Sequence, residues 1–129
     1  MNPRRRVLLV DDEDGIRLGL SRSLGRHYEI CTAADAFEGL ACVAHEGPFV
    51  AIIADFQMPG MDGLTMLRAV ARIAPRTVRI LFTGTLGIKH TVEESGATVG
   101  LFRAIYKPAS TAELLAALDE AVREYDQDG

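Results

Sequence analysis

Short apolar runs alternate along the chain with longer segments in which apolar residues recur at helical spacing. Most of these runs are apolar at successive positions, which is typical of strands covered on both faces; the second run alternates weakly. Glycine, proline or acidic residues stand at their ends and delimit them. The pattern predicts five strands, at residues 7–10, 28–32, 50–55, 78–82 and 101–106.

Four segments between and after these runs predict amphipathic helices. Residues 35–38 and 110–113 are capping-box patterns that begin two of them, and Gly25 and Pro75 end two others. The apolar stripes expected to face the core are Ile16, Leu20 and Leu24; Phe37, Leu40, Ala41 and Ala44; Leu64, Leu67, Val70, Ala71 and Ala74; and Leu114, Leu115, Leu118 and Val122.

Residues 85–100 carry the weakest pattern. Ile88 and Val92 predict a short helix, but the glycines between positions 84 and 100 dilute its helical propensity. We expect this segment to be the most mobile part of the protein.

Strands that alternate with helices require a parallel sheet with helices on both faces, because parallel neighbours need crossover connections. The chain has 129 residues, enough to bury a sizeable core without disulfides. The sequence therefore predicts an α/β fold, with one doubly wound five-stranded parallel sheet in a single domain of residues 1–129.

Charge and composition narrow the functional classes. The net charge of -4 argues against direct nucleic-acid binding, and Arg4-Arg5-Arg6 is interpreted as a solvated flank of the first strand. Neither a membrane-spanning run nor a signal-peptide pattern is visible, so we expect a cytoplasmic protein with no membrane partner. Cys31 and Cys42 lack metal-site spacing and are expected to be reduced packing residues; the histidines are expected at the surface.

Polar residues follow four of the predicted strands at the point where each ends. They are Asp11 and Asp12, Asp55, Thr83 and Lys107. The carboxyl ends of parallel strands share one edge of the sheet, so these side chains can converge. Carboxylates about 4 Å apart repel by roughly 4 kcal/mol, so such a cluster needs a cation, and Mg²⁺ prefers oxygen ligands of this kind. Asp55 is the candidate nucleophile toward a phosphoryl group.

Taken singly, each of these residues has a purely structural interpretation. Asp12 or Asp14 could cap the first helix, Thr83 could end a strand, and Lys107-Pro108 could form a turn. Their combination at one edge of one sheet favours the chemical interpretation.

Four stretches together resemble the receiver domain of two-component response regulators. They are Val10-Asp11-Asp12-Glu13, Asp55-Phe56-Gln57-Met58-Pro59-Gly60-Met61-Asp62-Gly63, Leu81-Phe82-Thr83-Gly84 and Tyr106-Lys107-Pro108. The resemblance covers almost the whole chain and implies a flavodoxin-like (βα)5 fold with strand order 2-1-3-4-5. Residues 77–84 and 101–103 resemble, more weakly, receivers that precede cyclic-di-nucleotide phosphodiesterase domains.

The resemblance implies which residues hold the phosphoryl group and the metal. Asp55 would be the phosphoacceptor. Mg²⁺ would be held by Asp12, Asp55 and the backbone carbonyl of Gln57, with Asp11 assisting mainly through water. Gln57 and Thr85 would occupy the positions that tune how quickly water removes the phosphoryl group.

The remaining positions of the motif also acquire roles from the resemblance. Thr83 would donate a hydrogen bond to one phosphoryl oxygen, and Lys107 would pair with another. The bond between Lys107 and Pro108 is expected to be cis. Gly84 is expected to be small because a side chain there would crowd the incoming group.

One departure concerns the residue three places before the lysine. Many receivers carry an aromatic side chain there that swings inward on phosphorylation, and this chain has Ala104. Tyr106 points to the opposite face from its immediate neighbours in a strand, so it cannot simply be assumed to replace that aromatic side chain. We expect residues 85–100 to carry the change instead, as an order shift beside the last helix.

The function implied is a phosphorelay switch, not an independent enzyme. Its expected partners are a histidine kinase or phosphotransfer protein and a downstream target or fused output domain. A homodimer through the last helix and fifth strand is also possible from the sequence.

Three alternatives remain open at the level of sequence. The chain could be a receiver-like interaction or dimerisation module that is not phosphorylated, which the alanine at position 104 favours. It could be a flavodoxin-like cofactor binder, although the acidic residues 11–14 oppose a bound phosphate. An independent phosphatase would need a second acid-base pair, and none is visible.

Overall fold

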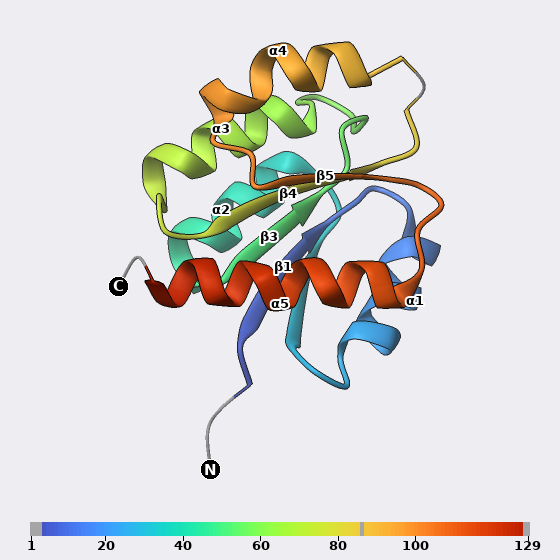
Figure 1. Ribbon diagram of the computed structural model, residues 1–129, viewed down its shortest axis with the longest axis vertical. Coiled ribbons are helices and arrows are strands. Elements are labelled where there is room, and N and C mark those ends of the chain that lie inside the picture. Colours follow the sequence, from blue (N-terminus) through green and yellow to red (C-terminus); the bar gives the residue numbers. More distant parts are fainter. Residues whose placement is uncertain (1–3, 86, 128–129) are drawn as a thin grey trace.

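The computed structural model describes residues 4–85 and 87–127. A parallel sheet with helices on both faces forms its centre (Figure 1), and the strand order β2-β1-β3-β4-β5 confirms the predicted doubly wound α/β fold. The strands are β1 (Arg6–Val10), β2 (Glu29–Ala33), β3 (Ala51–Ala54), β4 (Val78–Thr83) and β5 (Arg103–Tyr106). The helices are α1 (Asp14–Leu24), α2 (Ala36–Glu46), α3 (Gly63–Ile73), α4 (Lys89–Val99) and α5 (Thr111–Gln127).

The sheet separates two apolar cores, because successive residues of a strand point to opposite faces. In β3, Ile52 and Ala54 pack on the side of α2, α3 and α4, whereas Ala51 and Ile53 pack on the side of α1 and α5. None of the four is more than 1% exposed. The central strand is therefore covered on both faces, as its unbroken apolar run predicted.

The predicted core face of α2 was wrong at three of its four positions, since only Leu40 packs against the core. Phe37 is 59% exposed, and Ala41 and Ala44 are exposed as well. The buried residues of this helix are Ala36, Gly39, Cys42 and Val43. A Cβ atom on Gly39 would lie 3.0 Å from Val10 Cγ2, so the helix approaches the sheet through its small residues and the bulky Phe37 is turned outward.

The uncertain segment forms a regular helix, α4, as Ile88 and Val92 predicted; it begins after Ile88 and includes Val92, and both residues are buried. Tertiary packing thus overrides the low helical propensity of Gly96, the glycine within α4. The helix ends at Gly100, whose φ of 69° is the left-handed conformation that glycine adopts readily. The strand that follows begins at Arg103, later than predicted. The mobility expected of residues 85–100 stays a prediction.

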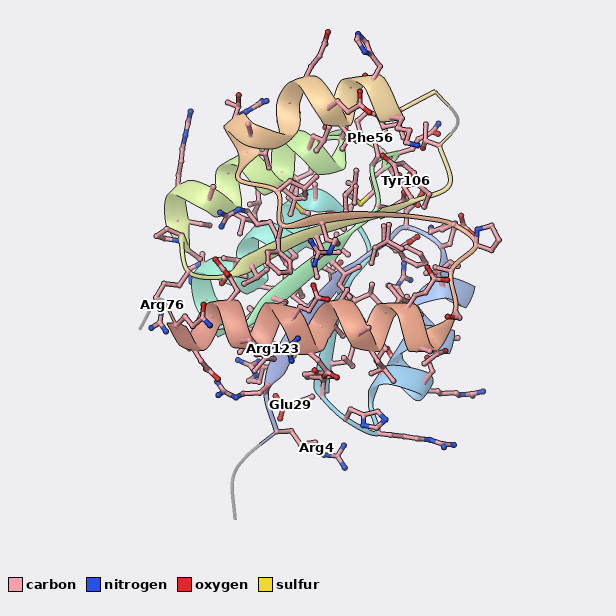
Figure 2. The ribbon with its side chains drawn as sticks, in the orientation of Figure 1. Arg4, Glu29, Phe56, Arg76, Tyr106 and Arg123 are labelled. Atoms are coloured by element: carbon pink, nitrogen blue, oxygen red, sulfur yellow. The ribbon has the colours of Figure 1, made fainter. Side chains whose placement is uncertain are left out.

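Arginines gather at the edge where the strands begin, which we call the amino edge. Arg5 pairs with Asp126 of α5 at 2.8 Å, and Arg6 pairs with Glu29 of β2 at 2.7 Å. Arg4 donates to the carbonyl of Gly25. In Figure 2, Arg4 and Glu29 lie at the opposite end of the molecule from Phe56 and Tyr106. Arg4 and Arg5 therefore flank β1 as exposed residues, as predicted, whereas Arg6 is the first residue of the strand, and the contacts of all three tie β1 to neighbouring elements.

Among the described residues, none of the helices combines the length and the apolar character needed to cross a membrane.

Candidate functional site

Strand register brings the candidate residues to the opposite edge, which we call the carboxyl edge. The paired residues near the strand ends are Val10 with Ala54, Ala54 with Leu81, and Thr83 with Tyr106. Asp11, Asp55 and Lys107 are therefore each the first residue after a strand. Backbone hydrogen bonds continue one residue further, from Asp55 N–H to Val10 at 3.1 Å and from Lys107 N–H to Thr83 at 2.9 Å.

Three carboxylates converge at this edge. Oxygen atoms of Asp11, Asp12 and Asp55 all lie within 4.8 Å of one another. Asp11 and Asp55 are 1% and 7% exposed, whereas Asp12 is exposed. Asp55 Oδ1 is buried and has no hydrogen-bond partner among the described residues. Because a buried carboxylate oxygen is costly to leave unpartnered, this atom marks a place for a cation or another ligand.

Lys107 is the cation closest to the acids. Its Nζ lies 3.0 Å from Asp11 Oδ2 and 3.4 Å from Asp55 Oδ2. Burial by itself lowers the pKa of Lys107, but the hydrogen bonds and negative charges of the two carboxylates outweigh it, and the pKa is raised. The peptide bond to Pro108 is cis, as the resemblance implied.

Thr83 ends β4 and is fully buried. Its hydroxyl oxygen accepts a hydrogen bond from the Thr85 N–H at 3.1 Å and donates to the Thr85 hydroxyl at 3.1 Å. A Cβ atom on Gly84 would meet only the stem of Lys107, at 3.5 Å, which is ordinary van der Waals contact. The hydroxyl that would bind a phosphoryl oxygen is thus engaged by the loop that follows it.

The acidic loop after β1 does not cap α1 with a side chain. The N-cap residue is Glu13, and it makes no side-chain capping bond, so the capping interpretation of Asp12 and Asp14 is wrong. The Glu13 N–H instead donates to Asp11 Oδ1 at 2.9 Å. The carboxylate of Asp12 consequently remains open to the pocket.

The site opens into a pocket of about 350 Å³. Its lining residues are Asp12, Glu13, Asp55, Gln57, Gly84, Thr85 and Lys107. Polar and charged groups dominate this lining, and the acids outnumber the single cation. An oxygen-rich, negatively charged pocket of this kind suits a hard divalent cation and a phosphoryl group.

Tyr106 and Ala104 lie on the same face of β5, and both pack against the core formed with α2, α3 and α4. Ala104 pairs with Leu81, whereas Tyr106 pairs with Thr83. Lys89 at the start of α4 lies 6.0 Å from the Tyr106 ring centroid. The only aromatic side chain of β5 therefore stands beside the threonine of the site, two residues beyond the expected position.

Gly63 is a site residue that the sequence interpretation quoted but did not explain. A Cβ atom there would overlap the carbonyl oxygen of Asp55 and lie 2.8 Å from its carbonyl carbon. The Gly63 N–H donates to Phe56 at 2.8 Å and closes the loop after the strand. Glycine at the first position of a helix, directly after its N-cap Asp62, was the available signal.

Comparison with known families gives a match to the model described as the response regulator receiver domain, over residues 7–119.

Two relatives and one solved structure illustrate the similarity. The transcriptional regulator NtrC of Salmonella typhimurium is 32% identical over 122 residues, which are 94% of this chain but only 25% of that protein. Sporulation initiation phosphotransferase F of Bacillus subtilis is 27% identical, and the match covers 93% of this chain and 92% of that protein. The CheY-like receiver domain protein of Methanospirillum hungatei has a TM-score of 0.90 at 28% identity, covering 98% of this chain and all of that one.

Proposed function

The chain belongs to the response regulator receiver domain family, and from this premise we propose that residues 1–129 form one receiver that accepts a phosphoryl group on Asp55 and thereby changes its affinity for a partner protein. The buried, unpartnered Asp55 Oδ1 carries the proposal, because Asp55 lies with Asp11, Asp12 and Lys107 at a polar pocket. Receiver domains are signalling domains, and no further catalytic function is proposed.

The residues of the pocket fit a bound Mg²⁺. Asp12, Asp55 and the backbone carbonyl of Gln57 would hold it. Both carboxylate oxygens of Asp11 already accept hydrogen bonds, from Glu13 and Lys107, which supports a contact through water. Mg²⁺ bound there supplies positive charge that offsets the negative charge of the phosphoryl oxygens.

The side chains then divide the transfer among them. An oxygen of Asp55 bonds to phosphorus while the phosphorus–nitrogen bond of a phosphohistidine breaks, and the electron pair returns to the imidazole of the donor. Lys107 exchanges its contact with Asp55 for a phosphoryl oxygen. The hydroxyl of Thr83 exchanges its hydrogen bond to the Thr85 hydroxyl for one to another phosphoryl oxygen. Gly84 carries no side chain and so leaves space beside these groups.

Partners follow from the same proposal. A histidine kinase or phosphotransfer protein would supply the phosphoryl group in the cytoplasm, and an apolar groove of about 600 Å³ beside Lys107 offers it a contact surface. The groove is lined by Ile16 and Leu20 of α1 together with Pro108 and Ala109. The output would be a downstream protein or a fused domain, since the chain spans about a quarter of the NtrC relatives it matches. A homodimer through α5 and β5 belongs to the same proposal, whereas direct contact with nucleic acid or membrane does not.

The test is intact-mass measurement after incubation with Mg²⁺ and acetyl phosphate. We expect a single phosphoryl adduct on the wild-type chain and none on Asp55→Asn. A wild-type chain that stays unmodified would contradict the proposal and favour the alternative, a receiver-like interaction module without phosphorylation, which Ala104 in the switch position supports. Incubation without Mg²⁺ tests the metal requirement separately.

A further inference from the structure

Asp11, which begins the acidic loop, is held at every polar atom. Its N–H donates to the carbonyl of Ala33 in β2 at 3.2 Å. Its Oδ1 accepts from the Glu13 N–H, and its Oδ2 accepts from Lys107. Its own carbonyl accepts from Arg17 Nη1 at 2.6 Å. The peptide that joins Asp11 to Asp12 is therefore fixed from α1 by a guanidinium.

Arg17 uses its other terminal nitrogen on a different acid of the same run. Nη2 pairs with the carboxylate of Asp14, which is 85% exposed, whereas the side chain of Arg17 is only 18% exposed. One guanidinium thus bridges the two ends of the loop that begins α1. The helix makes no side-chain capping bond at its N-cap Glu13, so the Arg17 guanidinium and the Asp11 carboxylate together hold this turn.

Among the three aspartates of the acidic loop, the hydrogen bonds of the described residues leave one carboxylate unoccupied. Asp11 is occupied by Glu13 and Lys107, and Asp14 is occupied by Arg17. Within the described residues, no hydrogen bond engages the carboxylate of Asp12, and this is the acid that lies within 4.8 Å of the ligand oxygens of Asp11 and Asp55.

We infer that Arg17 is a positioning residue for the metal site: it fixes the Asp11–Asp12 peptide and withholds Asp14, so that Asp12 is the acid presented with Asp55. This inference rests on the proposed function, because it assumes that Mg²⁺ binds between Asp12 and Asp55. Residues that hold metal ligands in place commonly change metal affinity when they are replaced, although they do not touch the ion.

The direction of the change in Mg²⁺ affinity distinguishes a positioning role of Arg17 from a simple effect of its charge. Arg17 is a cation beside a cation site, so by charge alone its removal would tighten Mg²⁺ binding, and removal of the Asp14 charge would weaken it. Positioning predicts the reverse order: Arg17→Met weakens binding although the site becomes more negative, and Asp14→Asn has little effect because the Arg17–Asp11 bond survives.

The experiment measures the affinity of the unphosphorylated chain for MgCl₂ by titration calorimetry, with thermal unfolding in EDTA to show that each variant is folded. We expect binding to weaken about tenfold in Arg17→Met and severalfold in Arg17→Lys, which keeps the charge but not the forked geometry. Asp14→Asn and Arg22→Met, an exposed arginine of the same helix, should stay within about twofold of wild type.

Unchanged or tighter Mg²⁺ binding by Arg17→Met overturns the inference. If Arg17→Met does not fold, the inference is overturned by an Arg17→Lys variant whose Mg²⁺ affinity equals that of the wild type. A wild-type chain that binds no Mg²⁺ overturns the metal site itself, and with it the positioning role. Weaker Mg²⁺ binding by Arg17→Met supports the inference. The proposed function is judged separately, by the mass of the phosphoryl adduct on Asp55, so failure of the inference and failure of the proposed function are distinguishable.

Discussion

The two edges of the sheet use charge in opposite ways. At the amino edge each arginine meets fixed partners: Arg6 contacts the carboxylate of Glu29 and lies 4.6 Å from the Phe49 ring centroid, and Arg79 donates to backbone carbonyls. At the carboxyl edge two of the three acids, Asp11 and Asp55, share one lysine, and Asp55 Oδ1 has no hydrogen-bond partner among the described residues.

This difference indicates that the charged groups of the amino edge stabilise the fold, whereas some of those at the carboxyl edge are available to bind a ligand. A charge with a complete set of partners holds neighbouring elements together and has little left to offer a ligand. A carboxylate cluster with incomplete partners costs stability, and that cost is recovered when a cation binds. Substitutions at the two edges should therefore have opposite signatures.

The largest expected effect is that of Gly63→Ala at the carboxyl edge. The new methyl group would overlap the carbonyl of Asp55, and because that neighbour is backbone it cannot rotate away. We expect a loss of about 3 kcal/mol in the free energy of unfolding, measured by urea denaturation. Gly84→Ala is the control, since its methyl group meets only Lys107 at 3.5 Å and should change stability by less than about 1 kcal/mol. Equal effects would refute the close approach.

Next in size is Arg79→Met at the amino edge. Arg79 donates to the carbonyls of Val99 at 3.1 Å and Thr77 at 2.8 Å, and burial lowers its pKa. It also places a positive charge at the end of α4, whose last turn contains no basic residue. We expect a loss of about 2 kcal/mol in unfolding free energy, with Mg²⁺ binding unchanged.

Arg123→Met is the matched control for that substitution, because Arg123 is an exposed arginine of α5 (Figure 2). If both variants lost the same stability, the contacts of Arg79 would not be what holds the end of α4.

A smaller effect of opposite sign is expected for Asp12→Asn. In EDTA, removing one of three neighbouring carboxylates should raise the free energy of unfolding by up to about 1 kcal/mol, because like charges no longer repel. The same variant should lose the increase in melting temperature that Mg²⁺ gives the wild type. Asp126→Asn removes an acid paired with Arg5 at the amino edge, and it should keep that increase. A destabilised Asp12→Asn in EDTA would contradict the comparison.

The smallest effect is the pH dependence carried by Lys107. The folded-state pKa is raised above the ordinary value of 10.5, so the lysine stabilises the fold fully below that value and loses this contribution as the pH rises through the folded pKa. The difference in unfolding free energy between wild type and Lys107→Met should therefore be constant from about pH 7 to 10 and shrink above about 10.5. A difference that vanished below about pH 9 would argue against the raised pKa of Lys107.

Much of the fold was predictable because burial on both faces leaves a simple pattern. The apolar run at Ala51–Ala54 predicted a central strand, and the alternation of strands with helices predicted the parallel sheet. Which face of a helix is buried was less predictable. In α2 the large Phe37 is exposed and Gly39 is buried, because the helix lies so close to the sheet that a small residue is needed at the contact. A pattern of apolar residues does not specify that distance.

Of the candidate site, the sequence by itself determined the chemistry: acids after β1 and β3, a hydroxyl after β4 and an ammonium after β5, since strand ends of a parallel sheet share one edge. Only the tertiary structure decided which of these groups are free. Asp11 is occupied by Lys107, Asp14 by Arg17, and Thr83 by Thr85, whereas within the described part of the chain Asp12 and the buried Oδ1 of Asp55 have no hydrogen-bond partner. Hydrogen bonds between residues far apart in the chain depend on register and side-chain direction, which a linear pattern does not contain.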